Sequence, residues 1–278
     1  GLSRRRALQA MAAALAATAL PAQVRAASRG TRAVVGAAWR GPRESDPYFA
    51  GTLIADWEAR SLGFGYKVPL PTRPHGILAE SDGGLLVCGV RPGTWLLRCD
   101  GQGKITQQID VQAEGDCRLG GHAIASADGE RLYTTETDYA SGRGKIGVRD
   151  RRSLRKIAEW ETHGIEPHQV LLDGQGHLVV ANGGIPRTLN DRKIDIDRMD
   201  ASLVRIDHTN GQLLGKWKVD DPRLSLRHMA WSRAPQDPDA LLGIAMQAEH
   251  DLEADRRRAP ILAVFDGKDL GIPTREND

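Results

Sequence analysis

The stretch PHQVLLDGQGHLVVANGG, residues 167–184, consists of a leading histidine, an apolar run, a turn with Asp-Gly and a second histidine, and a second apolar run. Two short apolar segments joined by a turn rich in aspartate and glycine predict a β-hairpin. The pattern recurs as PHGILAESDGGLLVCGV from Pro74, as GHAIASADGERLYTTETD from Gly121 and, more loosely, as RHMAWSRAPQDPDALLGIAMQAE from Arg227. The sequence is therefore built from repeats.

The spacing of the repeats predicts the architecture. Their leading histidines are separated by 47, 46 and 60 residues, close to the ~40–50 residues of a four-stranded propeller blade. Apolar segments in 145–164 and 202–219 supply third and fourth strands, residues 33–70 fit a first blade without a leading histidine, and 256–270 fit part of the last blade. We predict an all-β fold, a β-propeller of four-stranded blades, with residues 183–200 as a long surface loop.

This architecture predicts where the histidines lie. The first strand of a blade lines the central channel of a propeller and the second strand returns to the same mouth. We therefore expect a histidine from each repeat at the channel mouth, surrounded by polar residues from the second strands and the loop entering the third repeat. The candidate metal ligands are His75, His122, His168 and His228, and the candidate surrounding residues are His163, Glu166, Glu136, Asp138, Asn182, Gln247 and Glu249.

Neutral imidazole is a good ligand for iron, copper and zinc, so the repeated histidines predict a transition-metal site. There is no HExxH motif and no Cys/His zinc spacing. In the alternative interpretation, each histidine hydrogen-bonds a neighbouring loop and has a structural role. His177 and His208, beside turn residues, are expected to be exposed, and His250 lies in a polar loop.

The sequence favours a binding protein over an enzyme. No G-x-S-x-G elbow, phosphate loop or dinucleotide-binding glycine motif is present. Two alternatives stay open: a metal-dependent lactonase or esterase using His168, Glu166 and His228, and a scaffold without a small ligand. The formal charge of +2, from 38 basic and 36 acidic residues, argues against nucleic acid as a partner.

The N-terminal residues predict export. Arg4, Arg5 and Arg6 precede an Ala/Leu-rich stretch, which is typical of a twin-arginine signal peptide covering residues 1–26. The mature chain, a single propeller domain over 30–278, is expected in the periplasm without membrane insertion. Cys88, Cys99 and Cys117 are an odd number, and whether two of them form a disulfide is left open.

Three stretches, GHAIASADGERLYTTETD, THGIEPHQV and SLRHMA, resemble the DUF1513 family of exported bacterial proteins of unknown function. The resemblance covers about Ala33 to the end. It implies a seven-bladed propeller of the WD40/YVTN and quinoprotein-like group, and partners among periplasmic metal-uptake, iron-acquisition or redox proteins. Because the mature chain provides only five to six blades at ~45 residues each, we expect the final blade or more to be missing.

Overall fold

The computed structural model describes residues 31–273, so the predicted signal peptide lies outside the described residues. Contacts divide this part of the chain into two compact units. Unit 1 comprises residues 31–87 and 97–108, and unit 2 comprises residues 88–96 and 109–273. No helix among the described residues is both long and apolar enough to cross a membrane.

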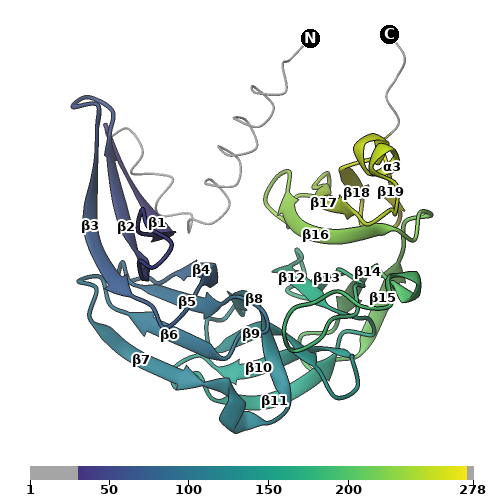
Figure 1. Ribbon diagram of the computed structural model, residues 1–278, viewed down its shortest axis with the longest axis horizontal. Coiled ribbons are helices and arrows are strands. Elements are labelled where there is room, and N and C mark those ends of the chain that lie inside the picture. The colour runs from purple at the N-terminus through teal and green to yellow at the C-terminus, as the bar shows by residue number, and fades with distance from the viewer. Residues whose placement is uncertain (1–30, 274–278) are drawn as a thin grey trace. The chain divides into compact units, whose positions relative to one another are not determined.

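The described chain forms five antiparallel sheets, in each of which the strands are paired in chain order (Figure 1). The first sheet has three strands and the others have four, so the predicted four-stranded repeats are confirmed for all four histidine-led segments. The sheets are β1 (Arg32–Arg40), β2 (Tyr48–Asp56) and β3 (Ser61–Pro69); β4 (Pro74–Ala79), β5 (Leu85–Gly89), β6 (Trp95–Cys99) and β7 (Ile105–Asp110); β8 (Cys117–Ala125), β9 (Arg131–Asp138), β10 (Gly144–Asp150) and β11 (Lys156–Glu161); β12 (Pro167–Leu172), β13 (Leu178–Asn182), β14 (Ser202–Ile206) and β15 (Leu213–Trp217); and β16 (Leu224–Trp231), β17 (Leu242–Ala248), β18 (Leu262–Phe265) and β19 (Leu270–Gly271).

Strand β13 shows why these segments fold as buried strands. All five of its residues are buried, because both faces of the strand are covered. Leu178 and Val180 belong to a core shared with β10 and β14, whereas Val179 and Ala181 belong to a core shared with β16 and β17. Each fully buried Leu or Val side chain contributes about 1.5–3 kcal/mol. Strand β12 of the same sheet contacts both β8 and β16, so the first strands of the three sheets in unit 2 are neighbours.

The turns follow from aspartate and glycine. In the turn after β12, Asp173 Oδ1 accepts hydrogen bonds from the backbone N–H groups of Gln175 and His177, both at 2.9 Å. Gly176 has a φ of 82°, a conformation that glycine adopts without steric cost. The same combination, a capping side chain followed by glycine at positive φ, occurs after β14 at Asn210 and Gly211.

Two segments differ from the sequence prediction. The insertion over 183–200 is not entirely on the surface, because Ile185 is buried. Within it, Ile196–Arg198 forms a 3₁₀ turn, η2. The polar segment after β17 contains a short helix, α3 (Glu253–Arg258), with an ion pair between Glu253 and Arg257 of the kind that stabilises exposed helices.

All three cysteines are free. Cys88 and Cys99 are buried and Cys117 is half-buried. Two of the tryptophans contact neighbouring strands or turns. Trp217 lies 4.6 Å from Phe265 between ring centroids, and Trp231 donates a hydrogen bond to the carbonyl of Leu172.

Candidate metal centre

Each of the three predicted histidine ligands in unit 2 lies in a β-bulge in the first strand of its sheet. In β8, residues 120–122 lie opposite Thr135 alone. In β12, His168 is the extra residue between Pro167 and Gln169, and in β16 Arg227 and His228 lie opposite one residue of β17. A bulge interrupts the alternation of side chains between the two faces of a sheet. Each histidine side chain can therefore point in a direction that it would not take in a regularly paired strand.

The β8 bulge depends on two glycines. Gly121 has a φ of 109°, which a side chain would strain. A Cβ on Gly120 would lie 2.7 Å from the carbonyl oxygen of Pro167 and from Thr135 Oγ1, so the approach of β8 to β12 requires glycine. His122 completes the bulge beside the Thr135 hydroxyl, which lies 3.4 Å from its backbone nitrogen.

A second contact joins the bulges of β12 and β16. The side-chain oxygen of Gln169 accepts a hydrogen bond from the backbone N–H of Met229. Because Gln169 follows His168 and Met229 follows His228, this contact holds the two histidines beside each other.

The three rings meet at one point. The Nε2 atoms of His168 and His228 lie 3.3 Å apart, and the ring centroid of His122 lies 5.4 Å from that of His168 and 5.2 Å from that of His228. One ring nitrogen from each residue lies within 4.8 Å of the others. Two nitrogens bound to one metal at ~2.0–2.1 Å with a tetrahedral angle are about 3.3–3.4 Å apart, so the pair formed by His168 and His228 already has the separation of two ligands.

His168 is held in its neutral form. Its residue is buried, and burial, followed by the positive charge of Arg227, lowers the pKa of the ring far below its usual range. The pKa of His228 is also lowered, by desolvation and then by Arg227, although the residue is exposed. Neutral imidazole is the form that binds metal ions.

The nitrogens of His168 have different partners. Arg91 Nη1 lies 3.3 Å and Arg227 Nη1 3.4 Å from its Nδ1. Because a guanidinium can only donate, these contacts assign Nδ1 as an acceptor, which leaves the ring hydrogen on Nε2, facing His228. A metal ion can bind Nε2 only when that proton is released to solvent, which leaves an imidazolate whose Nδ1 still accepts from the two guanidinium groups.

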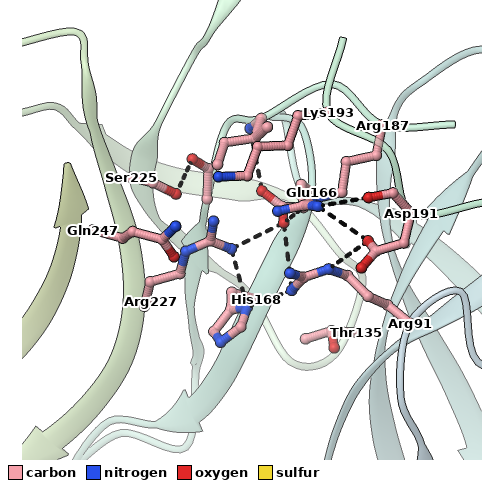
Figure 2. A network of polar contacts seen from close by, with 12 residues as sticks. Arg91, Thr135, Glu166, His168, Arg187, Asp191, Lys193, Ser225, Arg227 and Gln247 are labelled. Carbon is pink, nitrogen blue, oxygen red and sulfur yellow. Dashed lines mark hydrogen bonds and ion pairs between the residues drawn. The ribbon is translucent and has the colours of Figure 1, made fainter. Parts of the chain in front are cut away.

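An arginine cluster surrounds one carboxylate beside His168 (Figure 2). Glu166 Oε1 lies 2.8 Å from Arg187, 2.9 Å from Arg227 and 3.4 Å from Arg91. Asp191 pairs with Arg91 and Arg187, each at 3.1 Å. The three guanidinium groups thus face two carboxylates, and the cluster carries one excess positive charge next to the histidines.

Backbone strain accompanies this cluster. Glu166 has a φ of 52° and His163 a φ of 53°, which is uncommon for residues other than glycine and costs of order 1–3 kcal/mol. Such strain persists where the surroundings determine the conformation, and here the Glu166 carboxylate is fixed by the three arginines. The stretch HGIEPH is therefore shaped around Glu166 as well as His168.

The other predicted residues have partners of their own. Glu166 is an ion-pair residue of the arginine cluster and does not belong to the group of candidate ligand atoms. The carboxylate of Glu136 pairs with the fully buried Arg149 and with Lys156 within its own sheet. Asp138 caps the turn after β9 through Ala140 and Ser141.

The remaining four lie in loops and at strand ends. Asn182 donates from its side chain to the carbonyl of Thr162, Gln247 donates to Glu249, and Glu249 pairs with Lys193. His163 lines a cavity of about 470 Å³ together with Arg187 and Arg198. His75 lies in β4, in unit 1, so the candidate centre is described here from the histidines of unit 2.

Sequence reasoning missed the arginines. Arg227 precedes a predicted ligand, and a basic residue inside an apolar strand is a signal, because arginine is rarely buried without a partner. Arg187 and Asp191 lie in the insertion, where no periodicity indicated that side chains return to the sheet.

Comparison with known proteins places the fold and the family. Among solved structures, the chain is similar to hydrazine synthase from Kuenenia stuttgartiensis, with a TM-score of 0.55, 18% identity and coverage of 80% of this chain and 60% of that one. It is also similar to the WD40 β-propeller domain of Doa1, with a TM-score of 0.51, 11% identity and coverage of 81% and 62%, and to a candidate 6-phosphogluconolactonase from Bacteroides uniformis, with a TM-score of 0.53, 12% identity and coverage of 90% and 66%.

These similarities define a propeller-like all-β protein, and the chain spans about three fifths to two thirds of the length of each of those structures. The chain belongs to the DUF1513 family, described as proteins of unknown function, whose model matches residues 68–276. No curated protein matches it.

Proposed function

We propose that this protein binds a divalent transition-metal ion through the imidazoles of His122, His168 and His228. The observation that carries the proposal is the convergence of three histidines, each of which lies in a β-bulge. The Nε2 atoms of two of them, His168 and His228, are 3.3 Å apart. Regular strands would send alternate side chains to opposite faces, so three bulges at matched positions in successive sheets indicate a shared role for the three rings.

The chemistry of the ligands selects the class of metal. Imidazole suits copper, zinc, nickel and iron, and for a given set of nitrogen ligands the affinity rises toward Cu²⁺. No carboxylate belongs to the histidine group, which disfavours magnesium, calcium and manganese. We expect Cu²⁺ to bind more tightly than Zn²⁺.

The arginine cluster affects the charge of the bound species. Arg91 and Arg227 lie within 3.4 Å of the Nδ1 atom of His168, and across the ring their positive charges repel a dication bound at Nε2. An anionic fourth ligand, such as hydroxide or a carboxylate, offsets this repulsion. The proposed species is therefore a metal ion with a bound anion. The sequence repeat adds His75 as a further candidate ligand, and this part of the proposal depends on the repeat alone.

The test is metal titration of purified protein that has been stripped with a chelator. His168→Ala and His228→Ala are compared with His250→Ala, a control whose ring pairs with Asp221 at 3.0 Å. We expect the affinity for Zn²⁺ or Cu²⁺ at the centre to fall about 100-fold or more in the first two variants and to be unchanged in the control. Wild-type affinity in both His168→Ala and His228→Ala would contradict the proposal. Circular dichroism checks that each variant is folded.

A metal-dependent hydrolase is the second candidate, and one observation favours it. The His228 ring is exposed, so a metal held by the three imidazoles would keep a coordination position open to solvent, as catalytic zinc sites do. The similarity to the candidate lactonase, at 12% identity, concerns the fold alone. Turnover of a lactone and ester panel by the metal-loaded protein, lost in His168→Ala, would support the enzyme over the binding protein.

The cellular setting is also proposed. The twin-arginine pattern at the N-terminus supports export to the periplasm, where a metal-binding protein would deliver its ion to metal-uptake or redox partners. Cell fractionation with an antibody against the mature protein tests this, and recovery in the cytoplasm would contradict it.

A further inference from the structure

A second group of histidines lies at the opposite end of the β12–β15 sheet. His177 precedes β13, and Asp207 and His208 follow β14. Because Leu178 pairs with Ile206 in the antiparallel register, the turn that enters β13 and the turn that leaves β14 are adjacent. His168, in contrast, lies in the bulge at the beginning of β12.

Hydrogen-bonded turns present the two rings. The backbone of His177 is fixed by Asp173, whose other oxygen pairs with Arg205 at 3.0 Å. In the second turn, Asp207 Oδ1 accepts from the N–H of Thr209 at 2.7 Å, and the carbonyl of His208 lies 3.3 Å from the hydroxyl of Tyr133. Both histidines are partly buried, not exposed as the sequence suggested, and their positions are determined by the sheet.

The distances match those of ligands around a metal. The Nδ1 atoms of His177 and His208 are 3.4 Å apart, again the separation of ~3.3–3.4 Å expected for two nitrogens on one tetrahedral ion. A carboxylate oxygen of Asp207 lies within 4.8 Å of one ring nitrogen of each histidine. Hydrogen bonds from Thr209 lower the pKa of Asp207.

We propose that His177, His208 and Asp207 form a second metal site, independent of the centre at His168, for a divalent transition-metal ion. Two imidazoles and one carboxylate suit zinc, copper, nickel and ferrous iron. The carboxylate distinguishes this site from the three-histidine centre, because it neutralises part of the ion's charge without a bound anion.

The experiment is titration with zinc chloride or copper chloride alone, with the number of bound equivalents as the readout. The matched variants are His177→Ala, His208→Ala and Asp207→Asn, and the control in the same turn is Gln175→Ala, whose side chain is exposed. We expect His177→Ala and His208→Ala to lose one equivalent, Asp207→Asn to bind about 10-fold more weakly at this site, and the control to match wild type.

Combination with the centre variants separates the two proposals. His168→Ala should retain one equivalent at the second site, whereas His168→Ala with His177→Ala should retain none. Metal binding that is unchanged in both His177→Ala and His208→Ala would overturn the second site and show that the rings only hydrogen-bond each other. If His177→Ala and His208→Ala each lose one bound equivalent but His168→Ala binds as much metal as wild type, the second site stands. That result would contradict only the proposed function of the centre at His168.

Discussion

The Nε2 atoms of His168 and His228 lie 3.3 Å apart across two different sheets, although 60 residues separate them in the chain. The contact exists because β12 has a bulge at His168 and β16 has a bulge at His228. In a two-residue alternation a shift of one position reverses the direction of a side chain. The convergence of the histidines is therefore a consequence of where the ladders are interrupted.

The β8 bulge should depend on Gly120. A methyl group there would meet the Pro167 carbonyl oxygen at 2.7 Å, so Gly120→Ala is expected to destabilise the protein by about 1–3 kcal/mol through overpacking. The measurement is denaturant unfolding. Gly243→Ala, in β17, is the control, because its nearest neighbour would be at 3.6 Å. Equal free energies of unfolding for the two variants would show that the close approach of β8 to β12 at Gly120 is not required.

The arginine cluster should depend on Glu166. Glu166→Ala leaves Arg187 and Arg227 buried with their main partner removed, and such a loss typically costs about 3–5 kcal/mol. Glu166→Gln keeps the shape of the side chain but not the charge, and is expected to be destabilising as well. As a control, Glu253→Ala breaks an exposed ion pair and should change the free energy of unfolding by less than about 1 kcal/mol. Similar unfolding midpoints for Glu166→Ala and Glu253→Ala would contradict this account of the cluster.

The half-buried thiol of Cys117 should be unreactive at neutral pH. Burial, together with a hydrogen bond to the Glu159 carboxylate at 3.3 Å, raises its pKa to about 12. The thiolate, the reactive form, is therefore about three orders of magnitude scarcer at pH 8 than for a free thiol. The measurement is the rate of modification by a disulfide reagent between pH 7 and 10, with the modified residue identified by mass spectrometry.

Glu159→Gln provides the comparison for Cys117. The neutral amide no longer disfavours the thiolate, so the pKa should fall and the rate at pH 8 should rise. A fast wild-type reaction at Cys117, independent of this substitution, would refute the assignment.

The excess positive charge beside His168 predicts an anion effect. Added formate should strengthen Zn²⁺ binding at the centre, because a carboxylate ligand offsets the charges of Arg91 and Arg227. The second site provides an internal control, since Asp207 already supplies a carboxylate. Metal titration of His177→Ala, which lacks a ligand of the second site, measures binding at the centre. Metal titration of His168→Ala, which lacks a ligand of the centre, measures binding at the second site. An equal response of both sites to formate would mean that the arginines do not influence the ion.

The sequence predicted the positions of the strands because apolar alternation and Asp-Gly turns are local signals. The repeat of leading histidines predicted that His122, His168 and His228 occupy equivalent places in successive sheets, and the structure brings those three together. The bulges were not predictable, because a register shift depends on what packs across the sheet, as Gly120 against Pro167 shows.

The surroundings of the centre were less predictable than the histidines. Glu166 was expected among the channel residues, but its partners Arg187 and Asp191 come from an insertion without periodicity. His177 and His208 are predicted to be exposed from their positions beside turn residues, although the predicted antiparallel blade already places the turns before β13 and after β14 at the same end of the sheet. The adjacency of the two turns follows from the register of one strand pair.

X-ray absorption spectroscopy of the metal-loaded protein tests the central claim most directly. In the His177→Ala, His208→Ala double variant, which retains only the centre, the spectrum should show three or four imidazole nitrogens at about 2.0–2.1 Å from the ion. Adding His168→Ala should remove one of them or abolish binding. A bound ion with fewer than three imidazole ligands in the double variant would contradict the convergence of His122, His168 and His228 on one metal.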